Sequence, residues 1–393
     1  MMVIEILLCV IALALLIPVS VLCAQVLMAL PAYRPREMPD VRRPAVAILI
    51  PAHNEALMIA DTLASIVPQL AAGDQLLVVA DNCTDKTAAI ASAAGAEVTE
   101  RKDQERRGKG YALDFGIRWF ERKPPEVVII IDADCKVSAG TIDRLARMCN
   151  HTGRPVQALD LMHSPEGARV MTHIAEFAWV IKNYIRPLGY HRLGFPCALM
   201  GTGMAFPWPV IGNMTLSSGH LVEDIRLGIE LTRNGAPPLF CPEAMVTSDF
   251  PATAKGIRSQ RTRWEHGHLK VISEVPGLFV HALAHANVKL MALLVDLCVP
   301  PLALMMLLVL TIFAAGAAFF AVTGAVLPVG LAAIALGMLC SAVLLAWDQY
   351  GRHVISFGSL ACAPLYVLGK LPVYWKFLVQ RQVDWVRSRR EGR

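Results

Sequence analysis

Two carboxylates follow a run of five apolar residues near the middle of the chain. The run covers residues 127–131, and the carboxylates are Asp132 and Asp134. Five consecutive β-branched residues without polar alternation predict a strand that is buried on both faces of a sheet. Two hard oxygen donors at the carboxyl end of such a strand suit a divalent cation that neutralises a diphosphate. The alternative is an ordinary solvated turn, in which aspartate only ends the strand.

Two other predicted strands also end in polar turns. Residues 46–50 lead into Pro51, Ala52, His53, Asn54 and Glu55, and residues 75–79 lead into a turn that contains Asp81. A helical stretch follows each turn, and the repeat of strand, turn and helix predicts parallel strands. The three polar turns are therefore expected at one edge of the sheet, where open α/β sheets bind their ligands.

Two glycine-containing turns are further candidates for ligand contact. Gly108 and Gly110 flank Lys109 just before a predicted helix, which gives a cationic turn whose backbone amides can face an anion. A solvated basic loop is the alternative. The small residues of 201–206 allow a ligand to approach closely, or they form a bend before Pro207.

An acidic pair, Glu223 and Asp224, opens a predicted helix that runs to about Arg233. Acidic residues in a first helical turn often serve only as favourable partners for the helix dipole, and the pair by itself favours this interpretation.

The last polar segment of the middle region contains Gln260, Arg263 and Trp264. An arginine and a tryptophan in such a segment could bind a diphosphate and stack on a sugar. The alternative is a basic amphipathic helix that lies on a membrane surface. His266 and His268 follow, and we expect surface histidines there in preference to metal ligands.

The composition indicates a membrane protein with a soluble middle region. Of its 393 residues, 55% are apolar and 18% are charged, and the apolar excess lies at residues 3–30 and beyond residue 287. The net charge of +5 is concentrated beside these apolar segments, which indicates topology or contact with anionic lipid and not nucleic acid binding. The ten cysteines show no C-x-x-C pair, which favours free thiols in a reducing compartment.

The apolar segments predict three membrane spans. The apolar run at residues 3–30 is too long for a signal peptide and lacks the basic residues with which a signal peptide begins. The arginines that follow it predict a cytoplasmic location for the middle region. Two further spans are expected near residues 302–322 and 327–347, after an interfacial helix that ends near residue 299. Residues 357–379 are predicted to form an interfacial or re-entrant helix, with a fourth span as the alternative. The predicted segments are a spanning helix at 1–32, a cytoplasmic domain at 44–285, interfacial and spanning helices at 286–380, and a basic cytoplasmic tail at 381–393.

The order of these motifs resembles that of the membrane-embedded family 2 glycosyltransferases, which include cellulose, hyaluronan and poly-N-acetylglucosamine synthases. The resemblance rests on Asp81, on Asp132 and Asp134, on the pair at 223–224 and on the segment at 260–264. Two features depart from the family. Val222 stands where many synthases have threonine, and the chain has fewer predicted spans than the synthases that export a polymer, which leaves processivity open.

The resemblance implies a GT-A fold, an α/β Rossmann-like nucleotide-binding domain in the cytoplasm with transmembrane or interfacial helices at both ends. It implies that Asp132 and Asp134 hold Mg²⁺ or Mn²⁺ on the donor diphosphate, and that Asp224 is the general base. It also implies contacts to the nucleotide, the diphosphate and the acceptor from Pro51, Ala52, Glu55, Asp81, Lys109, Asp132, Gln260, Arg263 and Trp264.

The expected activity is an inverting transfer from a UDP-sugar to a hydroxyl of a lipid-linked or growing saccharide acceptor, at the cytoplasmic face of the inner membrane. One base without a carboxylate nucleophile fits a single displacement. A processive synthase that exports its product is the first alternative. Other classes are a membrane transporter that senses a nucleotide and an inactive scaffold, although a scaffold is expected to have lost some acidic motifs.

Overall fold

The protein is described here from a computed structural model, which covers residues 1–35, 41–217, 222–251 and 254–379, with only the backbone at 254–261 and 376–379. The chain divides into two compact units. The first, called here the sheet unit, contains Arg34–Pro165 and Phe195–Gly267. The second, called the helical unit, contains Met1–Tyr33, Glu166–Gly194 and the described residues from His268 onward.

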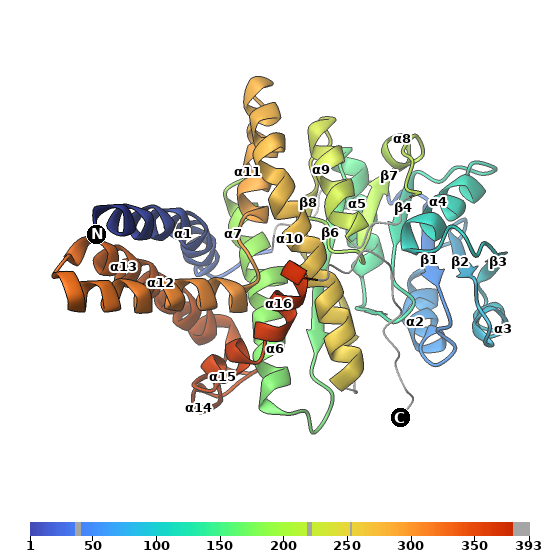
Figure 1. Cartoon of the computed structure of the whole chain (residues 1–393). Coiled ribbons are helices and arrows are strands. Elements are labelled where there is room, and N and C mark those ends of the chain that lie inside the picture. The colour runs from blue at the N-terminus through green and yellow to red at the C-terminus, as the bar shows by residue number, and fades with distance from the viewer. Residues whose placement is uncertain (36–40, 218–221, 252–253, 380–393) are drawn as a thin grey trace. The chain divides into compact units, whose positions relative to one another are not determined.

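An eight-stranded mixed sheet forms the centre of the sheet unit, with the strand order β3-β2-β1-β4-β7-β6-β8-β5 (Figure 1). The strands are β1 Val46–Ala52, β2 Gln75–Asp81, β3 Glu97–Arg101, β4 Val127–Ile130, β5 Lys136–Val137, β6 Val156–His163, β7 Met204–Pro207 and β8 Leu239–Asp249. The three strands predicted from the sequence are β1, β2 and β4. They are neighbours, and β1 pairs in parallel with both of the others, so the prediction of parallel strands with adjacent ends is confirmed.

Helices cover both faces of this sheet. The helices of the sheet unit are α2 Ile59–Ile66, η1 Val67–Gln69, α3 Thr87–Ala93, α4 Lys109–Phe120, α5 Thr141–Thr152, α8 Trp208–Ile211 and α9 Glu223–Arg233, and α10 Ala254–Ala284 begins in it. Helices α2 and α5 supply one hydrophobic core, and α4 and α9 supply the other. The predicted helix at 223–233 is therefore confirmed as α9.

Alternation along β4 decides which way the acidic motif faces. Ile129 and Ile131 belong to the core with α2 and α5, while Val128 and Ile130 belong to the core with α4 and α9. Successive side chains of a strand point to opposite faces, so a continued alternation directs Asp132 toward α4 and α9. Helix α4 begins with Lys109, and α9 begins with Glu223 and Asp224, so both helices start with charged residues of the predicted site.

The helical unit contains the apolar segments. Its helices are α1 Met2–Ala29, α6 Val170–Val180, η2 Ile181–Ile185, α7 Arg186–Arg192, α11 Val288–Leu297, α12 Leu302–Thr323, α13 Val326–Ala346, η3 Trp347–Gly351, α14 Phe357–Leu360, α15 Ala363–Leu368 and α16 Leu371–Val379. Three of the helices described are long and apolar enough to cross a membrane, namely α1, α12 and the stretch Val326–Gly351 (Figure 1). They coincide with the three predicted spans. Residues 357–379 form three short helices instead of one, none of them long enough for a fourth span.

A buried polar trio joins three helices of this unit. Arg186 of α7 donates from Nη2 to Asp296 Oδ1 of α11 at 2.7 Å and from Nε to Gln25 Oε1 of α1 at 3.1 Å. Gln25 Nε2 donates to the same Asp296 oxygen at 2.7 Å. Gly189 allows this contact, because a Cβ there would lie only 2.1 Å from the backbone oxygen of Gln25. Helix α1 is therefore fixed to the two shorter helices by charge-assisted hydrogen bonds.

We predict that Asp296→Ala destabilises the helical unit by about 3–5 kcal/mol, because it leaves the buried Arg186 guanidinium without its counter-charge. The matched control is Asp348→Ala, which removes the partner of Arg352 in a largely exposed ion pair and should cost roughly 0–1 kcal/mol. Thermal unfolding of the full chain in detergent measures both. Equal losses of stability in the two variants would contradict the role given to the trio.

Candidate active site

The polar turns after β1 and β2 are locked together by hydrogen bonds. Thr84 N–H donates to Asn54 Oδ1 at 2.7 Å, and the Cys83 thiol donates to Ala52 O at 3.4 Å. The Asn54 backbone has a φ of 57°, in the left-handed region that asparagine tolerates better than most residues. The two turns are thus one rigid edge of the sheet, as the parallel strands predicted. The predicted nucleotide-binding residues on this edge are Pro51, Ala52, Glu55 and Asp81.

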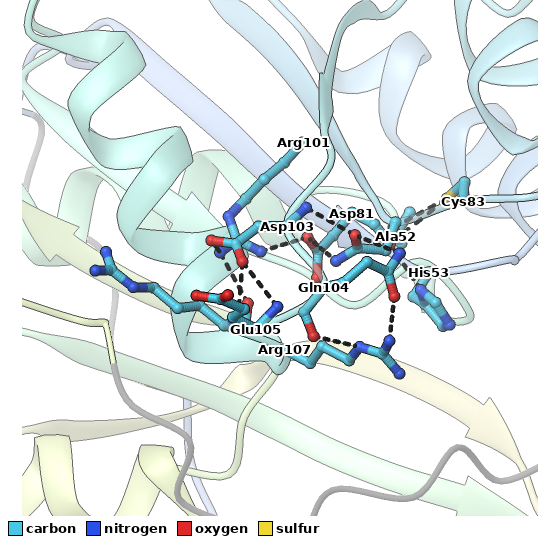
Figure 2. Close-up of polar contacts among 11 residues, drawn as sticks. Ala52, His53, Asp81, Cys83, Arg101, Asp103, Gln104, Glu105 and Arg107 are labelled. Atoms are coloured by element: carbon cyan, nitrogen blue, oxygen red, sulfur yellow. Dashed lines mark hydrogen bonds and ion pairs between the residues drawn. The ribbon is translucent and has the colours of Figure 1, made fainter.

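An arginine that the sequence analysis missed holds Asp81 in place. Arg101 Nη1 donates to Asp81 Oδ1 at 2.7 Å, while Nη2 donates to Asp103 Oδ2 at 2.9 Å and to Arg106 O at 2.8 Å (Figure 2). Both side chains of the Arg101–Asp81 pair are only 9% exposed. Arg101 therefore fixes the position of the Asp81 carboxylate and also anchors the loop that leads to α4. The pairing register of β2 and β3 places Asp81 opposite Arg101, and only the tertiary pairing reveals this partner.

Lys109, the first residue of α4, is an ion-pair partner of the acidic motif. Its Nζ lies 2.5 Å from Asp132 Oδ1 and donates to Gly201 O at 2.8 Å. Burial by itself would lower the pKa of Lys109, but the charges of Asp132, Glu223 and Asp224 outweigh it and raise that pKa. Lys109 is therefore a permanent cation at the end of β4 and not a solvated loop residue.

Among the side chains that the structure describes, the carboxylates around Lys109 outnumber the cations. Burial raises the pKa of Asp132, Lys109 opposes this effect, and Asp134 and Asp224 add to it. Burial likewise raises the pKa of Glu223 to about 7, again against Lys109. The excess of negative charge and the two hard oxygen donors of Asp132 and Asp134 fit a divalent cation. Within the part of the chain that the structure describes, no group of three His, Cys, Asp or Glu residues forms a metal cage. The remaining ligands of such a cation would therefore come from phosphate and water.

The predicted base lies beside this cluster. Asp224 is in the first turn of α9, and a Cβ on Gly201 would lie 3.4 Å from both Asp224 Oδ2 and Lys109 Nζ. Gly201 has a φ of 92°, which an L side chain rarely adopts. This glycine therefore lets Asp224 and Lys109 approach the same small space.

Helix α10 adds a second cation. Arg263 is half-buried, and burial lowers its pKa while Glu223, Asp132 and Asp134 act in the opposite direction. Arg263 thus lies within electrostatic reach of the acidic cluster. Trp264 follows it on α10 and is also half-buried, whereas the side chain of Gln260 lies outside the described residues.

The expectation of surface histidines on this helix is wrong. His266 is 3% exposed and His268 is 9% exposed. His268 Nε2–H donates to Leu297 O at 3.0 Å, and burial together with Lys182 and Arg186 lowers the pKa of His268 to about 4. The ring is therefore neutral, and its Nε2 is occupied as a hydrogen-bond donor.

Close packing of α10 explains this burial. A Cβ on Gly267, between the two histidines, would lie 2.5 Å from Val222 Cγ1. Helix α10 is thus in direct contact with the residue before α9 and does not present this turn to solvent.

The chain is similar in sequence to known glycosyltransferases. The family model described as "Glycosyltransferase like family 2" matches residues 44–267. The probable glycosyltransferase YdaM of Bacillus subtilis is 26% identical over 243 residues, which cover 58% of this chain and 56% of that protein. Glucomannan 4-beta-mannosyltransferase 7 of Arabidopsis thaliana is 24% identical over 262 residues, which cover 61% of this chain and 45% of that protein. The chain thus spans about half the length of these curated relatives.

A solved structure shares the fold over nearly the whole chain. The mannosyltransferase PcManGT from Pyrobaculum calidifontis, solved in complex with GDP-Man and Mn²⁺, superposes with a TM-score of 0.57 at 18% identity. The match covers 95% of this chain and 100% of that chain. The sheet unit therefore has the GT-A fold, a Rossmann-like α/β arrangement. On the family match over more than half of its length, the chain belongs to glycosyltransferase family 2.

Proposed function

We propose that the protein is an inverting glycosyltransferase that moves a sugar from a nucleoside diphosphate sugar to a hydroxyl of a lipid-linked or saccharide acceptor. One observation carries the proposal: Lys109, Asp132 and Asp224 meet around Gly201, with Arg263 within electrostatic reach. Two cations and a cation-binding carboxylate pair suit a leaving diphosphate, and a separate carboxylate suits the attacking hydroxyl.

The donor side of the site is assigned to five residues. Asp132 and Asp134 would hold Mg²⁺ or Mn²⁺, which when bound neutralises charge on the departing diphosphate. Lys109 and Arg263 add positive charge at the same place. Asp81, held in place by Arg101, has carboxylate oxygens that can accept hydrogen bonds, which suits an N–H edge of a nucleobase. Uracil and guanine both have such an edge, so this contact suits either nucleotide. We predict a UDP-sugar as the donor, as the family resemblance implies.

The acceptor side is assigned to Asp224. Its carboxylate lies near Lys109, the cation that pairs with Asp132, so it is close to the assigned diphosphate position. A base in this place takes the proton of the acceptor hydroxyl as the new glycosidic bond forms. The cluster contains no further group that we assign as a nucleophile, and a single displacement inverts the configuration at the anomeric carbon.

The helical unit is proposed to anchor the enzyme in the inner membrane with the sheet unit in the cytoplasm. Arg34, Arg42 and Arg43 follow the first apolar helix, which supports this orientation by the positive-inside rule. The three candidate spans favour transfer to a membrane-bound acceptor, because so few helices hardly enclose a channel for a polymer.

We expect Asp134→Ala to abolish sugar transfer while the protein remains folded, because it removes one of the two carboxylates assigned to the cation. Wild-type protein stripped with a chelator should be inactive and should recover with Mn²⁺ or Mg²⁺. Transfer from a panel of UDP-sugars and GDP-sugars to a membrane lipid extract measures this. Full activity in excess chelator would exclude the metal assignment.

Asp224→Asn should lower turnover by at least ~10²-fold and leave donor affinity within a few-fold of wild type, because an amide cannot accept the hydroxyl proton. Glu223→Gln is the matched control one residue away, and we expect a smaller loss from altered positioning alone. Steady-state kinetics separate the two effects. If Asp224→Asn weakens donor binding and spares turnover, the carboxylate is a helix cap and not the base.

The proposed orientation predicts the accessibility of introduced cysteines. Val326→Cys, at the exposed first residue of α13, next to the connection from α12, should react with a membrane-impermeant maleimide in intact cells. Arg34→Cys and a cysteine added at the C-terminus should react only after the membrane is opened. Labelling of the C-terminal cysteine from outside would indicate that residues 357–379 cross the membrane.

A further inference from the structure

One loop contacts the charged groups on both sides of the candidate site. We call residues 200–203 the bridging loop. Its Gly201 O accepts from Lys109 Nζ at 2.8 Å, and its Thr202 Oγ1 accepts from Asp132 N–H at 3.1 Å. The Gly201 Cα faces Asp224, since a Cβ there would lie 3.4 Å from Asp224 Oδ2. The position of this loop therefore sets how the donor carboxylates and the proposed base are spaced.

The Thr202 hydroxyl acts at both ends of the acidic turn. The Ile131 N–H still donates to Leu49 O of β1, at 3.1 Å, whereas the next amide, that of Asp132, turns away to Thr202 Oγ1. The same hydroxyl donates to Cys135 Sγ at 3.5 Å. Thr202 is 4% exposed, so these bonds are shielded from water. One hydroxyl thus fixes the segment that carries both Asp132 and Asp134.

A buried glutamine holds the bridging loop from the other side. Gln157 of β6 has no exposed surface, although most of its neighbours in the strand are apolar. Its Nε2 donates to Thr202 O at 2.8 Å and to Ala158 O at 2.9 Å, and its Oε1 accepts from Met200 N–H at 2.8 Å. A buried amide is costly unless it is hydrogen-bonded, and two of these three bonds go to the backbone of the loop. These contacts place Gln157 behind the loop, so it acts on the site through Thr202.

We propose that Thr202 and Gln157 are positioning residues that set the cation affinity of Asp132 and Asp134 and their spacing from Asp224. The inference rests on the proposed function, because it assigns the support of the same donor site. Groups that orient metal ligands typically change metal affinity or activity by roughly 10- to 100-fold when they are removed. The hydroxyl of Thr202 is the smallest group in this support and can be removed with little change of shape.

The test compares Thr202→Val with Thr202→Ser in the full chain in detergent. The readout is the Mn²⁺ concentration for half-maximal binding of UDP, or of GDP if wild-type protein binds GDP instead, measured by calorimetry. We expect Thr202→Val to raise this concentration roughly 10- to 100-fold, and Thr202→Ser, which keeps the hydroxyl, to remain near wild type. Gln157→Leu should shift it in the same direction as Thr202→Val.

Thr141→Val is the matched control for a purely structural effect. Thr141 is 1% exposed, and its hydroxyl accepts from Met245 N–H and donates to Met245 O, both at 3.1 Å. This threonine makes the same kind of bond as Thr202, but to β8 and not to the acidic turn. We expect Thr141→Val to lower the melting temperature and to leave the Mn²⁺ requirement of nucleotide binding unchanged.

Asp134→Ala separates failure of the inference from failure of the proposed function. If Asp134→Ala loses Mn²⁺-dependent nucleotide binding while Thr202→Val and Gln157→Leu bind like wild type, the positioning role is wrong and the metal assignment stands. An equal shift in Thr141→Val and Thr202→Val would also overturn the positioning role. If Asp134→Ala binds like wild type, or wild-type protein binds neither nucleotide, the proposed function fails and the inference fails with it.

Discussion

The ion pair of Lys109 and Asp132 is the interaction on which the candidate site depends. Buried carboxylates repel one another, and Asp132 and Glu223 both have raised pKa values as a result of burial. A lysine fixed among them by Gly201 O makes this concentration of acid tolerable in a folded protein. Among the described side chains the carboxylates of the site still outnumber its cations, which is the basis for proposing a divalent cation there.

The order of the strands determines that these groups meet. Strands β1, β2 and β4 are adjacent, so their carboxyl ends form one edge, and α4 and α9 cover the same face of the sheet. Because both helices begin at this edge, their first residues face the end of β4. The helical unit is held together differently. There, the ion pair of Arg186 and Asp296 joins the short helices α7 and α11, and Gln25 connects both of these residues to the long apolar helix α1.

Sequence patterns predicted the elements whose local signal is strong. The apolar runs of β1, β2 and β4 and of the three long apolar helices are clear because a strand buried on both faces and a spanning helix show no polar alternation. Strands β3, β5, β6, β7 and β8 were missed. The residues of the last three include buried polar groups such as Gln157, and their pairing is decided by strands distant in sequence. His266 and His268 were expected at the surface because their burial depends on what packs against α10.

The family, the three parallel strands and the three long apolar helices could be predicted from the sequence, because each leaves a pattern in residues that are close in the chain. Only the tertiary structure decided which charges pair. Arg101 meets Asp81 across two strands, and Lys109 meets Asp132 through the end of a helix. Thr202 reaches the amide of Asp132 across 70 positions of the sequence. Hydrogen bonds and ion pairs depend on distances of a few ångströms, and only the folded chain sets those distances between residues so far apart in sequence.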